Sequence, residues 1–403
     1  MVERIPTSSY HQLQHFISDS QWEHQPVLQA VGRDISILLG KKGGLRGLTI
    51  DEEGHPKKGQ QSVGVARQYL GSIGKVDNGQ VSVFAALNQG DDVAMVNVKL
   101  FLPKAWCDDK KRCEKVGIPP TEQGYRSKWE LALAMLDEME GQLHYDWVNG
   151  DGFYGNAQGF RAGLAHRNQL FVLDIHQDQG VYLQPPLPYV PLSTEKGRGR
   201  RPSLLISDQP PLKANDLLSR LQEQDWKTYT FRAGTKGAMT RQVYTTPVYL
   251  WNAKSADDKL VEKYTLLISR KTDGSEVKYA LANDVENLHH PKLSDAALLY
   301  RQMNPYWVER GIQDCKDTLG MTDYQVRSWR AFYHHITLTI MALHYMLIQK
   351  VNHQHTIPLL SCPDIKFALA MTLPSKITSQ EQVWKTIRQR HKQRQDDMDR
   401  YKT

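Results

Sequence analysis

The spacing of apolar residues changes character along the chain. Apolar positions recur at helical spacing over residues 8–40, which predicts two or three short helices. From Gly47 onward the apolar runs become short and strand-like, over 48–50, 80–87 and 94–102, with turn residues between them. The N-terminal half therefore begins with helices and continues into hairpin-linked strands.

The following elements alternate between helix and strand. Residues 127–140 ("SKWELALAMLDEME") predict an amphipathic helix that begins at a serine. A short strand is expected over 145–151, a helix over about 156–167 and another strand over 170–175. Hairpin-linked strands followed by strand–helix–strand units are typical of a mixed α/β fold with at least one parallel crossover.

This alternation breaks after residue 176. Residues 177–202 are rich in Pro and Gly and end in a basic cluster, and residues 226–282 alternate Thr, Tyr and Val as strands do. Helical periodicity resumes at about 294 and leads to a polar, basic tail. The predicted divisions are a helical N-terminal region (1–46), a first core part (47–176), a β-rich insertion (177–285), a second core part (286–350) and a helical basic tail (351–403).

Composition is that of an ordinary globular protein, with 40% hydrophobic and 24% charged residues in a chain of 403. The net charge of +7 favours a polyanionic partner, but many basic proteins bind no nucleic acid. Four scattered cysteines do not make a disulfide framework. No stretch approaches the roughly 20 apolar residues that span a membrane, and the N-terminus has no apolar signal core, so a cytoplasmic protein is expected.

Three acidic residues stand where catalytic groups are often displayed, near the ends of predicted elements. Asp51 closes the apolar run of "LTIDEEGHPKKG", in which the strand is expected to end by Gly54 and Glu52 to face the opposite side. Asp151 lies between two glycines in "WVNGDGFYG", a pattern that also suits a plain turn. Glu309 shares one helical face with Lys316, although both could simply be solvated.

Two Asp and one Glu suffice to bind a pair of Mg²⁺ or Mn²⁺ ions, which take oxygen ligands and activate phosphodiester chemistry. On this hypothesis Glu52 and Glu53 are bystanders. Nearby cations could hold the flanking phosphates. These candidate DNA contacts are Lys57, Lys58, Lys316 and Arg327.

The three acidic segments, in this order, resemble the catalytic blocks of DDE transposases from bacterial insertion sequences. "TIDEEGHPKKG" with "SVGVARQYLGSIGKVDNGQVSVFAAL" is similar to the first block, "WVNGDGFYG" to the second, and "YWVERGIQDCKDTLGMTDYQVRSWRAFYHHITLTIMAL" to the third. The resemblance implies a ribonuclease-H-like α/β core with a β-rich insertion and helical terminal segments. It implies Asp51, Asp151 and Glu309 as metal ligands and Lys316 as a DNA-phosphate contact.

The chain departs from this family pattern just before the third acidic residue. Members often carry a Tyr and an Arg seven and four residues before the Glu, where this chain has Gln302 and Pro305. The resemblance therefore does not assign a phosphate contact to Gln302 or Pro305, and Arg301 or Arg310 is the alternative for that role.

The resulting expectation is a bacterial, cytoplasmic, nucleoid-associated transposase that uses two Mg²⁺ or Mn²⁺ ions to cut and join double-stranded DNA, acting as a dimer on DNA. Alternatives are a metal-dependent nuclease of the same fold and a domesticated DNA-binding protein without catalysis. The insertion's basic cluster is interpreted either as a DNA-contacting loop or as a solvated linker. Its candidate DNA contacts are Arg198, Arg200 and Arg201.

Overall fold

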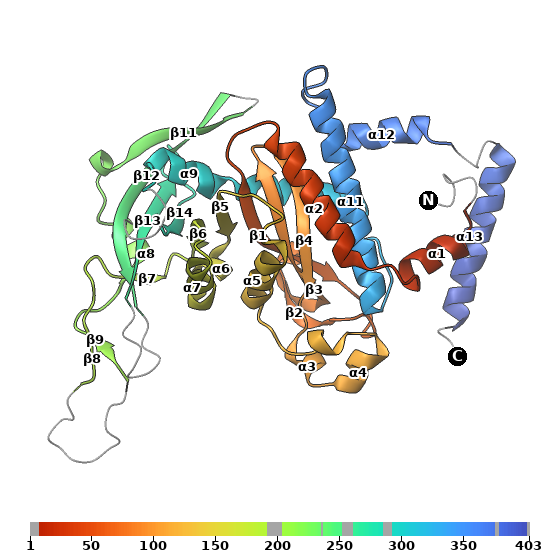
Figure 1. Ribbon diagram of the computed structural model, residues 1–403, viewed down its shortest axis with the longest axis horizontal. Coiled ribbons are helices and arrows are strands. Elements are labelled where there is room, and N and C mark those ends of the chain that lie inside the picture. The colour runs from red at the N-terminus through yellow and green to blue at the C-terminus, as the bar shows by residue number, and fades with distance from the viewer. Residues whose placement is uncertain are drawn as a thin grey trace, which may run out of the picture.

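A mixed ten-stranded sheet runs through the described part of the computed structural model, which comprises residues 8–191, 204–234, 237–251, 261–284, 292–374 and 379–400. The strands follow the order β11-β12-β13-β14-β6-β5-β1-β3-β2, and β4 also pairs with β3 (Figure 1). Their bounds are β1 (Gly47–Pro56), β2 (Ala66–Leu70), β3 (Lys75–Gln89), β4 (Asp92–Leu100), β5 (Trp147–Gly150), β6 (Phe171–Ile175), β11 (Lys227–Gly234), β12 (Gly237–Leu250), β13 (Glu262–Arg270) and β14 (Lys278–Ala282).

The centre of this sheet combines an antiparallel meander with two parallel strands. β3 pairs antiparallel with β1, β2 and β4. β5 lies parallel to β1, and β6 lies parallel to β5. Residues 80–88 of β3 are buried without alternation, as expected of a strand covered on both faces.

Strand β1 extends further than its sequence suggests. The sequence predicted an end by Gly54, but all ten residues of Gly47–Pro56 pair with β3. The reason is packing: a Cβ at Gly54 would lie 3.1 Å from Leu70, so glycine here admits a neighbouring strand and does not end the ladder. Because β1 continues, the side chains of Asp51 and Glu53 share one face of the sheet.

The β-rich strands after residue 226 extend the central sheet. β14 pairs antiparallel with β6 from Tyr279 opposite Ile175 to Ala282 opposite Val172, and β13, β12 and β11 follow outward. Two small sheets lie beside them, pairing β7 (Gly180–Val181) with β10 (Leu212–Lys213) and β8 (Pro188–Tyr189) with β9 (Ile206–Ser207).

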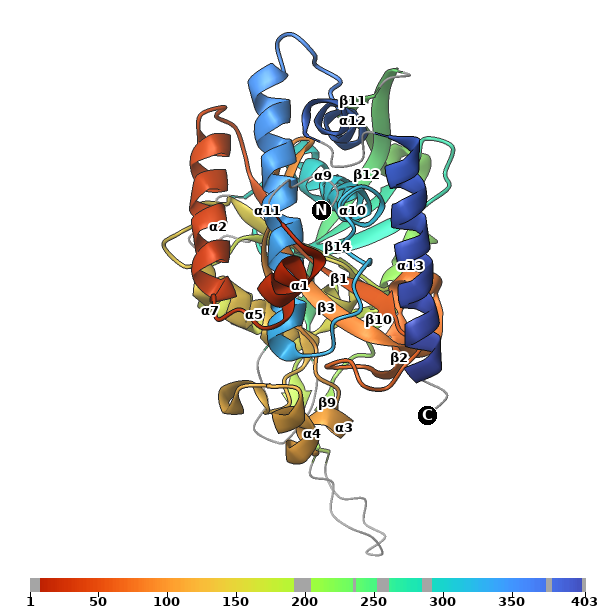
Figure 2. The same ribbon diagram turned by 90° about the vertical axis from the view of Figure 1, so that its right-hand side faces the viewer.

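Helices cover both faces of the sheet and extend beyond its β4 edge. α5 packs on β3 and β4, and its start follows the sequence signal, because Ser127 and Glu130 form a capping box. α2 and α11 lie side by side in both views (Figures 1 and 2), and α10 packs on β3 and β4. The bounds are α1 (Tyr10–Ser18), α2 (His24–Gly40), α3 (Lys104–Cys107), α4 (Lys110–Lys115), α5 (Lys128–Met139), α6 (Gly152–Asn156), α7 (Gln158–His166), α8 (Ala214–Leu218), α9 (Asp295–Met303), α10 (Pro305–Asp317), α11 (Trp329–His353), α12 (Cys362–Thr372) and α13 (Gln380–Arg400).

Within the described residues, no helix combines the length and the apolar character needed to cross a membrane.

One glycine position tests how tightly α6 is held against β6. A Cβ at Gly155 would overlap the carbonyl oxygen of Asp174, whereas a Cβ at Gly124 would meet nothing within 4 Å. We expect Gly155→Ala to lower the free energy of unfolding by about 1–3 kcal/mol, because backbone must shift to admit the methyl group. Gly124→Ala is the matched control and should change it little. Urea unfolding of both variants measures the difference, and equal stabilities would contradict the tight packing.

Candidate functional site

Two of the three predicted acids meet where parallel strands lie side by side. In the β1–β5 ladder, Ile50 is the register partner of Gly150. Asp51 follows Ile50 and Asp151 follows Gly150, and neighbouring strands lie about 4.8 Å apart. The parallel pairing thus brings together two carboxylates that are separated by 100 positions in the sequence.

The side chains of Asp51 and Glu53 face helix α10. Gly47 lies against the indole of Trp147, because a Cβ at Gly47 would lie 2.5 Å from that ring. Side chains alternate between the two faces along a strand, so those of Asp51 and Glu53 point to the same face as this contact. On this face Lys316 Nζ of α10 lies 3.2 Å from Glu53 Oε2. Helix α10 therefore runs beside β1 at the position of the acidic residues.

Glu309 projects from α10 seven residues before Lys316, so both lie on one face of the helix. Its charge acts on Asp51: the pKa of Asp51 is raised to about 7, chiefly by burial and further by the charges of Asp151, Glu309 and Glu52. A hydrogen bond from the Glu52 backbone N–H opposes this rise. The negative charges of the other acids thus all act on the Asp51 carboxylate.

Asp151 caps the N-terminus of the short helix α6. Its Oδ1 accepts a hydrogen bond from the Phe153 N–H at 3.0 Å, and its side chain is exposed. The flanking glycines are explained by packing: a Cβ at Gly150 would lie 2.9 Å from Tyr154, and one at Gly152 would overlap the ring of His176. The glycines therefore fit α6 against the strand ends while Asp151 stays open to solvent.

The types of donor suit a hard divalent cation, which takes carboxylate oxygens. Burial is the main cause of the raised pKa of Asp51, and the negative charges of Asp151, Glu309 and Glu52, which a cation would offset, raise it further. Across the described ranges, however, no three His, Cys, Asp or Glu side chains are arranged as they stand to hold a metal ion. Asp51, Asp151 and Glu309 are electrostatic neighbours and do not form a closed set of ligands.

The two glutamates after Asp51, interpreted from sequence as bystanders to metal binding, both form ion pairs. Glu52 faces the opposite side, where it forms an ion pair with Lys128 of α5 and accepts a hydrogen bond from the Tyr154 hydroxyl at 3.4 Å. Glu53 is 6% exposed and pairs with Lys316. Each of these acids thus pairs with a lysine, one on each face of β1.

Sequence reasoning missed Asp174, an acid on β6. Leu173 is the register partner of Gly150, so Asp174 follows Asp151 in the same row across the sheet. Gln302 of α9 donates a hydrogen bond to Asp174 Oδ1 at 3.1 Å, and burial raises the pKa of Asp174 to about 6. The signal was an acid near the end of the apolar run "LFVLDI".

The predicted cationic contacts lie in different settings. Lys57 is half-buried: its Nζ donates to the Tyr324 carbonyl at 3.0 Å, lies 3.5 Å from the centre of the Tyr324 ring, and has its pKa lowered to about 8 by burial. Lys58 and Arg327 are exposed, and the Arg327 carbonyl accepts a hydrogen bond from the Val63 N–H. The predicted contacts Arg198, Arg200 and Arg201 lie outside the described residues.

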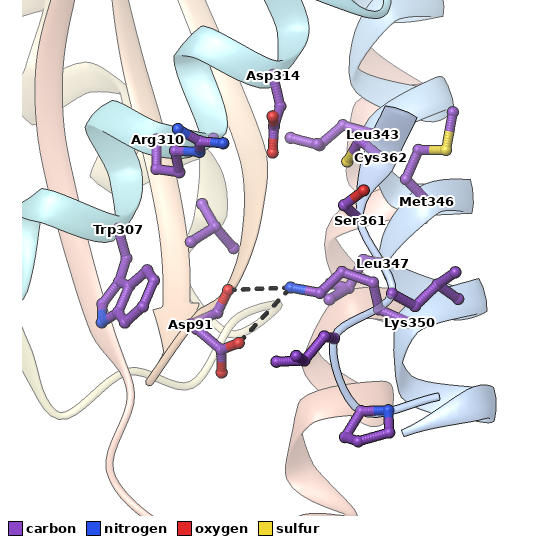
Figure 3. Close-up of a pocket in the computed structure, with 15 residues that line it drawn as sticks. Asp91, Trp307, Arg310, Asp314, Leu343, Met346, Leu347, Lys350, Ser361 and Cys362 are labelled. Atoms are coloured by element: carbon purple, nitrogen blue, oxygen red, sulfur yellow. Dashed lines mark hydrogen bonds and ion pairs between the residues drawn. The ribbon is translucent and has the colours of Figure 1, made fainter. Parts of the chain in front are cut away.

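Arg301 and Arg310 were the other candidates for the phosphate contact, and neither projects from the face of α10 that carries Glu309 and Lys316. Arg301 is 5% exposed, with its guanidinium 4.9 Å from the centre of the Trp147 ring. Arg310 lines a pocket of about 380 Å³ between α10, α11 and the start of α12, together with Trp307 and Asp314 (Figure 3). These α10 residues occupy the side of the helix away from Glu309 and Lys316.

Comparison with known proteins identifies the family. Residues 1–238, more than half of the chain, match the family described as "DDE superfamily endonuclease", and the chain belongs to this family. The match includes Asp51 and Asp151 and ends before Glu309.

A stretch of 175 residues is 29% identical to the "probable transposase for insertion sequence element IS701" of Microchaete diplosiphon. It covers 43% of this chain and 42% of that protein. The NurA nuclease from Sulfolobus solfataricus covers 77% of this chain and 98% of its own at 12% identity, with a TM-score of 0.23 that is too low to bear on the fold.

The raised pKa of Asp51 predicts a pH-dependent cost to stability. The folded-state pKa of about 7 lies above the unfolded value of 3.8, so the folded protein binds the extra proton and loses stability as pH rises between these values. We expect Asp51→Asn to gain stability over the native chain by on the order of 2 kcal/mol more above pH 8 than below pH 5. Urea unfolding at both pH values measures this difference, and a pH-independent difference would contradict the assignment.

Proposed function

We propose that this protein is a DDE transposase that cleaves DNA strands at the ends of an insertion sequence and joins them to target DNA. The observation that carries the proposal is the adjacency of Asp51 and Asp151 across β1 and β5, with Glu309 close enough to raise the pKa of Asp51. Family membership and the similarity to a probable transposase support it.

The strand order supports a ribonuclease-H-like core. The central strands lie in the order β4-β3-β1-β5-β6, with three antiparallel strands followed by two parallel ones. On this proposal the core comprises residues 47–176 and 286–350, and residues 177–285 form an insertion between the second and third acids. Residues 1–46 and 351–403 are the flanking helical regions.

Asp51, Asp151 and Glu309 would hold two Mg²⁺ or Mn²⁺ ions. Such ions, when bound, activate the attacking oxygen and stabilise the leaving oxygen of a phosphodiester. The protein's own contribution is to hold the three carboxylates at one edge of a rigid sheet. Asp51 must be deprotonated to serve as a ligand, and with its pKa raised to about 7 it loses its proton only as pH rises through that value.

Double-stranded DNA is the proposed partner, in the cytoplasm of a bacterium and associated with its nucleoid. Lys316, Lys57, Lys58 and Arg327 are the described candidates for contacting phosphates on either side of the cleaved bond. Two element ends must be held together for joining, so we propose that the protein acts as a dimer on DNA.

The three acids are tested by replacing each with alanine. We expect Asp51→Ala, Asp151→Ala and Glu309→Ala each to abolish Mn²⁺-dependent cleavage of element-end DNA while DNA affinity stays within a few-fold of the native value. Gel assays of cleavage and fluorescence anisotropy of binding measure the two properties separately. Full cleavage by any one variant would remove that residue from the site.

A nuclease of the same fold would cut DNA without joining it. We expect the native chain with Mn²⁺ to produce joined products when element-end DNA with a free 3′-hydroxyl is mixed with plasmid target. Cleavage without joined products would favour the nuclease. DNA binding with neither activity would favour the domesticated DNA-binding protein.

A further inference from the structure

The ion pair between Glu53 and Lys316 joins the strand of Asp51 to the helix of Glu309. Glu53 Oε2 and Lys316 Nζ are 3.2 Å apart. The glutamate side chain is only 7% exposed, whereas the lysine side chain is 22% exposed and reaches the surface. The carboxylate is thus fixed inside the protein, and the ammonium lies between it and solvent.

Glu53 lacks hydrogen bonds that a buried structural carboxylate would be expected to make. Its Oε1 is buried and, among the described residues, has no hydrogen-bond partner, and the same is true of the hydroxyl of Ser82, its register partner on β3. Burial raises the pKa of Glu53, and Lys316 is the group that opposes this rise. A buried ion pair with an unsatisfied oxygen contributes little net stability, so stability alone does not account for a glutamate here.

Of the basic residues near Glu53, Lys316 is the one whose ammonium can pass from the carboxylate to another anion. His55, two residues further along β1, is buried, and burial lowers its pKa to about 3, so it is neutral and does not compete for the carboxylate. Lys57 is occupied with the ring and carbonyl of Tyr324. An ammonium has three N–H donors, and one contact with Glu53 leaves others for an incoming anion.

We propose that Glu53 is a positioning residue that holds Lys316 beside the acidic site until a DNA phosphate takes the ammonium. This inference rests on the proposed function. The glutamate fixes the ammonium two helical turns from Glu309, and the phosphate must compete with it. Glu53 therefore weakens the binding of DNA at this contact while keeping Lys316 in place for it.

DNA affinity measured without metal tests this restraint separately from catalysis. The probe is a fluorescently labelled double-stranded DNA of mixed sequence, titrated in EDTA at several salt concentrations. We expect Glu53→Gln to bind about two- to fivefold more tightly, because the competing charge is gone. We expect Lys316→Gln to bind more weakly, with a salt slope smaller by about one. In the Glu53→Gln/Lys316→Gln double variant, the gain from Glu53→Gln should disappear.

Glu52→Gln is the matched control, because it removes the same charge from the adjacent residue, whose lysine partner lies on the opposite face. It should leave DNA affinity unchanged. The proposal is overturned if Glu53→Gln gives no gain, if the gain persists without Lys316, or if Glu52→Gln gives the same gain. Glu53→Met, similar in length and apolar, repeats the test if Glu53→Gln fails to fold. A native chain without DNA affinity would overturn the proposed function and the restraint together, whereas binding without the Glu53 effect overturns the restraint alone.

Discussion

The parallel pairing of β1 with β5 is the constraint on which the acidic site depends. Ile50 opposite Gly150 fixes the register, and a shift by one residue would turn every side chain of one strand to the other face. Asp51 and Asp151 are adjacent only in this register. The pairing is itself held by β3 on one side and β6 on the other, so the position of two carboxylates follows from a sheet whose central strands are covered on both faces.

This arrangement has an electrostatic cost at Asp51. Burial and three neighbouring acids raise the pKa of Asp51 to about 7, because both disfavour the charged form of its carboxyl group. The two adjacent glutamates are treated differently, since Glu52 pairs with Lys128 and Glu53 with Lys316. Lysines thus pair with both glutamates that follow Asp51, whereas the charged groups that shift the pKa of Asp51 are all acidic.

The sequence predicted more of the fold than of the site's details. Alternating and continuous apolar runs located β3, β4, β5 and β6, because burial determines both the pattern and the strand. The end of β1 was predicted wrongly at Gly54, because a glycine that admits Leu70 and a glycine that ends a strand look alike in one sequence. The partners of Glu52 and Glu53 were not predictable, because they depend on which helix covers which face. Asp174 was overlooked for the same reason, since its place beside Asp151 follows from strand register.

Helix α10 links these observations because its two sides differ in chemistry. One side presents Glu309 and Lys316 toward β1, and the other presents Trp307, Arg310 and Asp314 to the pocket beside α11. The face of α10 that presents Glu309 and Lys316 therefore meets β1 twice: Lys316 pairs with Glu53, and the charge of Glu309 raises the pKa of Asp51.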